Sequence, residues 1–229
     1  MNIKEFIKKS PKAELHLHIE GTLEPQQMFM FAKRNNIQIP FKNINDVKKA
    51  YNFSNLESFL KIYYEGAKVL LKEEDFFDLT WSYVLKCRDD NIVHTEIFFD
   101  PQTHTDRGVK FNTIINGIYK ALQKAEKEFG LSFKIIMCVL RHLDEKSGLR
   151  TLEQASSHKD KIFGIGLDSS EKNNPPSKFQ KLFRIARQKN FVTVAHAGEE
   201  GPPEYIWEAL NLLKVKRIDH GVKCFDDEK

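Results

Sequence analysis

Short apolar runs alternate with longer amphipathic segments along most of the chain. Six runs rich in β-type residues end in a polar or small residue, at positions 13–19, 92–99, 133–140, 162–167, 191–195 and 215–218. Between several of these runs, helix-like stretches cover positions 76–88, 114–128, 177–189 and 203–213. Strands that alternate with helices at this spacing predict a parallel sheet with helical crossovers.

Polar side chains gather at the ends of the predicted strands. The polar residues at or just after these ends are His18, Asp100, His142, Asp168, His196 and His220. In a (β/α) barrel the chemistry sits at the carboxyl ends of the strands, so the layout predicts an α/β fold of the TIM-like (β/α) barrel type. Residues 25–71 contain no clear strand and predict extra helices over the barrel mouth.

We predict one barrel domain over residues 1–229, since no internal repeat, low-complexity tract or Gly/Ser linker interrupts the pattern. A single barrel domain of this kind commonly has about 250 residues and eight strands. The six candidate strands are fewer than that. Either two strands escape this pattern or the barrel is incomplete, and we expect an incomplete barrel that lacks the last strands.

Composition limits the kinds of partner that the protein can bind and the cellular compartment in which we expect it. Charged residues make up 30% of the chain, yet the net charge is only +4 and no basic stripe or tail appears, which argues against nucleic-acid binding. No apolar run approaches the ~20 residues of a membrane span, and the N-terminal residues do not resemble a signal peptide. The three cysteines form no CxxC pair, which favours a reducing compartment. We expect a soluble cytoplasmic protein.

The first candidate for chemistry is the sequence His16-Leu17-His18. Residues two apart in a strand point to the same face, so the two imidazoles lie side by side at the end of the first strand. Such a pair can bind one zinc ion, and a catalytic zinc keeps a further position open for water. The alternative is a pair of half-buried strand histidines.

Two further strands end in histidine. His196-Ala197-Gly198-Glu199 follows the fifth run, and Arg217-Ile218-Asp219-His220-Gly221 follows the sixth. A histidine ligand with a carboxyl nearby is typical of hydrolytic zinc sites, in which the carboxyl moves the proton. Glu199 has an alternative reading as an ordinary acid at a helix start. Three strands that each bring histidine to one end of a fold favour a metal site.

These three motifs together resemble the adenosine deaminase family. The segments 13–25, 99–108, 166–171 and 195–205 are more similar to its adenine deaminase branch. The resemblance covers essentially the whole chain and implies a zinc-dependent (β/α) barrel that acts on a purine, a small molecule. It implies hydrolysis of adenine to hypoxanthine and ammonia in purine salvage.

The resemblance also implies a role for each candidate residue. His16, His18 and His196 would bind one Zn²⁺ per chain, which makes the attacking water reactive at neutral pH. Glu199 would protonate purine N1, and His220 would orient or deprotonate the water. Because Glu199 must carry a proton when substrate binds, we expect burial to raise its pKa.

Glu20 is a candidate substrate-binding residue. Relatives that act on nucleosides carry Asp at this position, where it contacts the ribose. The longer Glu20 would exclude ribose or meet the base, or it would only brace its loop. His104, in a loop that the branch shares, is either structural or lines the mouth of the site.

The resemblance also implies features that this sequence lacks. Family members continue for about a hundred residues past the Arg-Ile-Asp-His-Gly motif, with the last two strands and an Asp-Asp pair that supplies a fourth zinc ligand. We do not expect Asp226 and Asp227 to replace that pair, since they follow His220 too closely. The alternatives are therefore an adenosine deaminase or a non-catalytic zinc-binding remnant.

Overall fold

The computed structural model describes residues 2–228. The chain divides into two compact units. The first comprises the chain up to Asn52 with Ile62–Phe99 and Thr103–Lys134, and the second comprises Phe53–Lys61, Asp100–Gln102 and the chain from Ile135 onward. Three elements have residues in both units: α4 (Leu56–Ala67), α6 (Pro101–Thr105) and β3 (Ser132–Leu140).

The first unit contains two complete parallel strands and most of the helices of the N-terminal half. In chain order its elements are α1 (Ile3–Lys9), β1 (Lys12–His18), η1 (Ile19–Thr22), α2 (Pro25–Asn35), α3 (Ile44–Ala50), α5 (Glu73–Asp89), β2 (Ile92–Phe99) and α7 (Phe111–Phe129). β1 and β2 are parallel, and His18 lies opposite Phe98 in their register. The strand pairing therefore fixes where the His16-Leu17-His18 motif ends.

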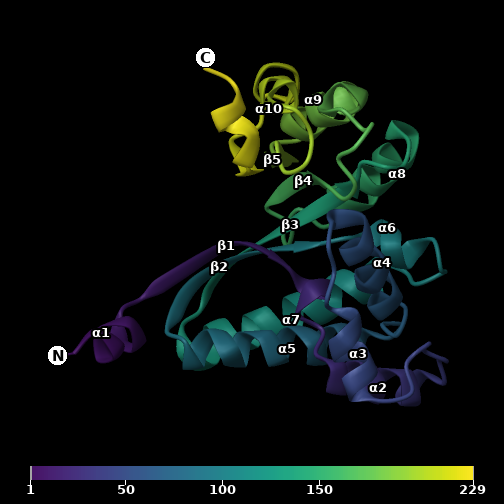
Figure 1. Cartoon of the computed structure of the whole chain (residues 1–229), viewed down its shortest axis with the longest axis vertical. Helices are drawn as coiled ribbons and strands as arrows, with labels where there is room; N and C mark the ends of the chain where they lie inside the picture. Colours follow the sequence, from purple (N-terminus) through teal and green to yellow (C-terminus); the bar gives the residue numbers. More distant parts are fainter. Residues whose placement is uncertain (1, 229) are drawn as a thin grey trace. The chain divides into compact units, whose positions relative to one another are not determined.

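Helices α5 and α7 pack closely against each other in the first unit (Figure 1). The buried residues of α7 recur every three or four positions, which gives the helix one apolar face. Gly117 lies on that face, and a Cβ there would stand 2.4 Å from the backbone oxygen of Glu73 at the start of α5. A glycine at this position therefore lets the two backbones approach. α7 ends at Gly130, whose φ of +72° is a left-handed conformation that glycine tolerates.

The second unit repeats the strand–helix alternation. After the end of β3 it contains α8 (Glu145–Ser156), β4 (Gly164–Asp168), η2 (Pro176–Phe179), α9 (Gln180–Gln188), β5 (Val192–Ala197), α10 (Pro203–Glu208), η3 (Ala209–Leu213), β6 (Arg217–His220) and η4 (Val222–Asp226). The strands are parallel, with Leu140 opposite Asp168 and Ala197 opposite His220. All residues of β4 are buried, as expected for a central parallel strand.

The strand order follows the chain, β1-β2-β3-β4-β5-β6. Each predicted strand is present within about two residues of its predicted bounds, and the region 25–71 contains helices α2, α3 and α4 and no strand, as expected. Among the described residues there are six strands in this sheet, which is the predicted number.

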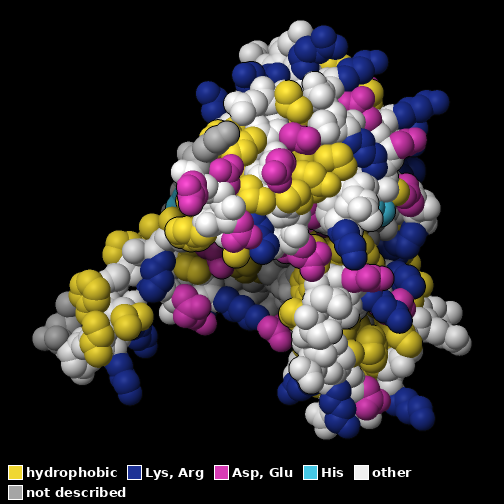
Figure 2. All heavy atoms as spheres, turned by 45° about the horizontal axis from the view of Figure 1, so that its top comes forward, with side chains coloured by type: hydrophobic (Ala, Val, Ile, Leu, Met, Phe, Trp, Pro, Cys, Tyr) yellow, Lys and Arg dark blue, Asp and Glu magenta, His cyan; other side chains and the backbone are white. Residues whose placement is uncertain are grey.

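The surface carries charges of both signs. In the face shown in Figure 2, Lys and Arg side chains are interspersed with Asp and Glu rather than gathered in a stripe. Within residues 2–228, no helix combines the length and apolar character needed to cross a membrane.

Candidate active site and metal ligands

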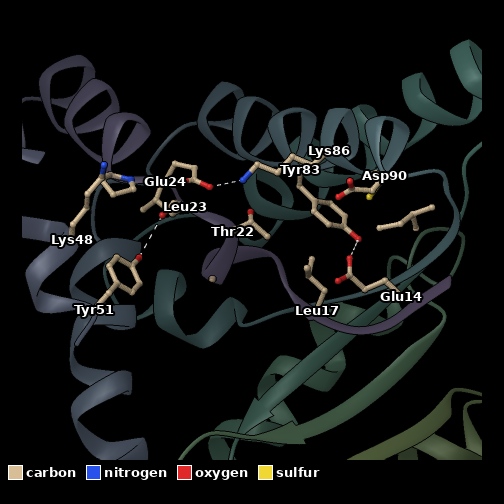
Figure 3. A pocket seen from close by; sticks show the side chains of 14 residues that line it. Glu14, Leu17, Thr22, Leu23, Glu24, Lys48, Tyr51, Tyr83, Lys86 and Asp90 are labelled. Atoms are coloured by element: carbon tan, nitrogen blue, oxygen red, sulfur yellow. Dashed lines mark hydrogen bonds and ion pairs between the residues drawn. The ribbon is translucent and has the colours of Figure 1, made fainter. Parts of the chain in front are cut away.

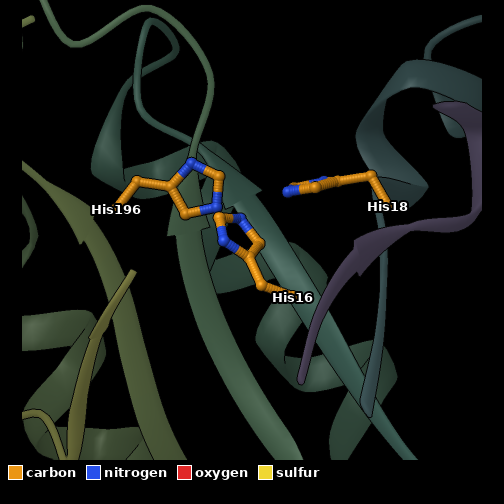
Figure 4. Close-up of side chains that lie close together, drawn as sticks. All are labelled: His16, His18 and His196. Carbon is orange, nitrogen blue, oxygen red and sulfur yellow. The ribbon is translucent and has the colours of Figure 1, made fainter. Parts of the chain in front are cut away.

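The first unit contributes the histidine pair of β1 (Figure 4). The rings of His16 and His18 lie edge to face with their centroids 5.5 Å apart, as the period of a strand requires. The ring of Phe98 in β2 contacts both imidazoles, with its centroid 5.2 Å from that of His16 and 4.9 Å from that of His18. An aromatic neighbour thus limits the positions of both imidazoles, while His16 and His18 stay half-buried.

Glu20 follows directly in η1 and is buried. Its Oε1 lies 3.0 Å from Nε2 of His104, and the hydroxyl of Tyr63 donates to its Oε2 at 3.3 Å. Arg107 donates to Nδ1 of His104 at 2.9 Å, so the hydrogen of the neutral ring is on Nε2 and is donated to Glu20. His104 is therefore a buried partner of Glu20. Of the two roles considered for it, the structure favours the structural one.

In the second unit, β5 and β6 bring His196, Glu199 and His220 together. The two imidazole centroids are 4.6 Å apart. Oε2 of Glu199 lies 3.3 Å from Nε2 of His220 and 3.9 Å from Nδ1 of His196. One ligand-type atom from each of the three residues lies within 4.8 Å of the others. The sequence motifs 196–199 and 217–221 thus form one cluster.

Burial changes the protonation of this cluster. Burial, together with the negative charges of Glu171 and Glu200, raises the pKa of Glu199 to about 7, while Arg141 opposes the change. Burial also lowers the pKa of His220. At neutral pH the site therefore holds a carboxyl that can keep its proton beside an imidazole that is neutral. A protonated carboxyl suits a proton donor better than a metal ligand, since a metal binds the carboxylate form.

Imidazole nitrogens are good zinc ligands, and these histidines fit that chemistry. His16 and His18 offer two nitrogens from one strand, and His196 is a buried histidine near the end of another (Figure 4). The carbonyl of His196 accepts a hydrogen bond from Nη1 of the buried Arg141 at 2.8 Å. That bond fixes the backbone that carries the His196 side chain.

Glu171 is a residue of this region to which the sequence assigned no role. Its buried carboxylate accepts hydrogen bonds from the backbone N–H groups of residues 198–201. It belongs to the segment 166–171, whose resemblance to adenine deaminases is apparent in the sequence. Its target lies 27–30 residues further along the chain, so only the folded structure shows the contact.

Other candidate residues have local partners. Nδ1 of His142 lies 2.8 Å from the hydroxyl of Ser169. Asp227 accepts a hydrogen bond from the indole of Trp207 at 2.7 Å, and Asp226 pairs with Lys223 at 3.1 Å. These contacts give the terminal acids local structural partners.

The first unit also has a cavity of about 540 Å³ beside β1, lined by Glu14, Tyr83, Lys86, Glu24 and Tyr51 among others (Figure 3). The hydroxyl of Tyr83 donates to Glu14 at 2.6 Å, and Lys86 pairs with Glu24. None of the predicted site residues lines this cavity.

Comparison with known proteins identifies the class. The sequence model of the family described as adenosine deaminase matches residues 11–229. The chain belongs to the adenosine deaminase family, whose members are hydrolytic deaminases. Within this family it is similar to adenine deaminases, as the sequence motifs predicted.

Two curated relatives show the extent of this similarity. An adenine deaminase of Acinetobacter baylyi is 59% identical over 227 residues, which cover 99% of this chain and 68% of the relative. An adenine deaminase of Wolinella succinogenes is 59% identical over 226 residues, with the same coverage of 99% and 68%. The chain thus spans about two thirds of the length of these relatives.

Solved structures confirm the fold class. The adenine deaminase from Arthrobacter aurescens matches with a TM-score of 0.92 at 47% identity, over 94% of this chain and 66% of that one. An amidohydrolase from Burkholderia ambifaria, solved with bound zinc, matches with a TM-score of 0.90 at 25% identity, over 99% of this chain and 64% of that one. The predicted α/β barrel architecture, with six strands among the described residues, is confirmed.

Proposed function

We propose that this chain catalyses the hydrolytic deamination of adenine to hypoxanthine and ammonia. The observation that carries the proposal is the Glu199 carboxyl, held 3.3 Å from His220, with a pKa of about 7. A weakly acidic carboxyl beside a neutral imidazole is what a hydrolytic deamination needs at neutral pH, because one group must donate a proton and the other must accept one. The adenine deaminase relatives support adenine as the substrate.

We propose that His16, His18 and His196 bind one zinc ion per chain. Their imidazole nitrogens suit zinc, and the zinc-bound relative from Burkholderia ambifaria supports the choice of metal. Bound zinc would supply a Lewis acid that makes water nucleophilic near neutral pH. Under this assignment both histidine-bearing strands belong to one purine-deaminase domain over residues 1–229, which the family match over residues 11–229 supports.

The protein side chains would then donate and accept the protons of the reaction. Glu199 donates its proton to N1 of the purine, which makes C6 more electrophilic. The proton that the attacking water gives up is passed on to the 6-amino group, which then leaves the tetrahedral carbon as ammonia. His220 accepts a hydrogen bond or a proton from the attacking water, because its lowered pKa keeps one ring nitrogen unprotonated. Their separation of 3.3 Å lets a proton pass between the two groups during turnover.

We propose that Glu20 selects the free base over the nucleoside. Its carboxylate is buried and its Oε1 is held by His104, so it has little freedom to move away from a bulky ribose. We also propose a role in purine salvage in the cytoplasm. The three cysteines are free thiols, which is the state that a reducing compartment maintains.

An ammonia-release assay on adenine and adenosine tests the proposal. Glu199→Ala should lower the rate on adenine by about 10²-fold to 10⁴-fold, as loss of a general acid does. Glu204→Ala, a change of an exposed acid in α10, is the matched control and should keep the wild-type rate. Equal rates for wild type and Glu199→Ala would remove Glu199 from its role. Faster turnover of adenosine would overturn the choice of substrate, and stoichiometric zinc without turnover would favour a non-catalytic zinc protein.

A further inference from the structure

One carboxylate holds the whole backbone of the loop that carries Glu199. Oε1 of Glu171 accepts the N–H of Gly198 at 2.8 Å. Its Oε2 accepts the N–H groups of Glu199 at 2.9 Å, Glu200 at 2.8 Å and Gly201 at 2.7 Å. Successive N–H groups that converge in this way form an anion-binding concavity, and here a side chain of the same protein fills it. Such charge-assisted bonds are stronger than neutral ones.

The backbone of this loop has no N–H donors besides the four that Glu171 accepts. It runs from the end of β5 at Ala197 to Pro202 and Pro203, where α10 begins. Proline has no N–H, so every N–H between β5 and α10 is donated to Glu171. The conformation of the loop is therefore set by one side chain that lies outside it.

The fit around Glu171 is tight. The residue is fully buried, and a Cβ on Gly201 would lie 2.7 Å from its carboxyl carbon. The buried Arg141 balances the charge, with Nη1 at 3.8 Å from Oε1 of Glu171. The same Nη1 donates to the carbonyl of His196 at 2.8 Å. Arg141 and Glu171 together thus fix the backbone at His196 and the backbone at Glu199.

We infer that Glu171 is a positioning residue for Glu199, which aims the Glu199 carboxyl at the reacting purine by holding the backbone of residues 198–201. The inference rests on the proposed deaminase function. It goes beyond that function because Glu171 acts through the backbone and has no assigned contact with the metal ion or the purine. Charge and shape are both required, since two oxygens must accept four N–H groups.

Glu171→Gln removes the negative charge of this side chain with little change in its volume, so it tests the requirement for charge apart from that for shape. The amide oxygen can replace one carboxylate oxygen, but the amide nitrogen then presents hydrogens to an N–H group of the loop. We expect kcat on adenine to fall about 10²-fold, which is typical of a small misplacement of a catalytic group. KM should change less than about threefold, because the contacts to bound purine are not removed. The zinc content per chain should stay at the wild-type value.

Glu145→Gln is the matched control. Glu145, in α8, also accepts a backbone hydrogen bond, from Leu182 at 2.9 Å, but among the described residues the loop 198–201 donates its backbone hydrogen bonds to Glu171 and not to Glu145. A purely structural effect would lower stability in both variants, whereas positioning lowers kcat only in Glu171→Gln. An unchanged kcat per zinc-loaded chain in Glu171→Gln would overturn the inference.

Hydrogen–deuterium exchange gives a second measurement that needs no substrate. The amides of residues 198–201 should be protected in the wild type and should exchange at least about tenfold faster in Glu171→Gln, while α8 keeps its protection. If these amides are unprotected in the wild type, the inference that Glu171 holds the loop backbone is wrong. If wild type fails to deaminate adenine, the proposed function is wrong, yet protection that is lost in Glu171→Gln would still support the control of this loop by Glu171.

Discussion

Replacing Glu199 with glutamine should stabilise the metal-free protein, and more so at high pH. The folded state raises the pKa of Glu199 to about 7 from an ordinary 4.5. A difference of about 2.5 in pKa corresponds to about 3 kcal/mol, since one pKa unit is worth about 1.4 kcal/mol. Only 21% of the side chain is exposed, so solvent screening reduces this value little.

The sign of the effect follows from proton binding. Below pH 4.5 the carboxyl is protonated in both the folded and the unfolded chain and contributes nothing. Between pH 4.5 and about 7 the unfolded chain loses its proton first, so the stability of the folded state falls as pH rises. Above about 7 the loss is complete. Glutamine is neutral throughout and escapes this loss.

Urea unfolding of chelator-treated protein at pH 5 and pH 8 measures the effect. The stability advantage of Glu199→Gln over wild type should grow by about 2 kcal/mol between these two pH values. Metal-free samples are needed because a nearby cation would favour the ionised carboxylate. Glu204→Gln, a change in an exposed acid, should show the same difference from wild type at both pH values. An advantage of Glu199→Gln that does not change with pH would refute the reasoning.

Three further outcomes test other parts of the structure. The kcat/KM on adenine should fall as pH rises, because Glu199 then loses the proton it must donate, and a rate that stays flat to pH 9 would contradict this. Removal of metal by a chelator should abolish ammonia release, and zinc should restore it where magnesium does not, since imidazole ligands suit zinc. Gly117→Ala should lower the free energy of unfolding, measured by urea denaturation, by about 1–3 kcal/mol. The reason is that its Cβ would stand 2.4 Å from the carbonyl oxygen of Glu73. A variant as stable as the wild type would contradict the close packing of α5 on α7.

Local patterns were enough to predict the strands. The run at 92–99 matches β2 at both ends, because it is rich in β-branched and aromatic residues and ends in the buried residues Ile97, Phe98 and Phe99. The predicted fifth strand stops at 195, whereas β5 continues to Ala197. The difference arises because His196 is polar yet buried, so hydrophobicity alone underestimates a strand that ends in a functional residue.

The candidate site was predictable only where its residues are close in sequence. His16 and His18 share a strand face, so their pairing follows from the period of two. The bond between Glu20 and His104 joins residues 84 apart, and the bonds from Glu171 reach 27–30 residues along the chain. Spacing carries no information on such contacts, because they depend on how separate elements pack.

The proposed selectivity of Glu20 for the free base depends on Arg107, a residue to which we assign no contact with the substrate. Its guanidinium donates to the carbonyls of Ala67 and Lys68, at 3.0 and 2.9 Å, as well as to His104. It thereby determines which tautomer of His104 faces Glu20. If that tautomer were reversed, a lone pair would point at the carboxylate and repel it. The discrimination between base and nucleoside that we assign to Glu20 would then depend on an arginine that binds the end of α4.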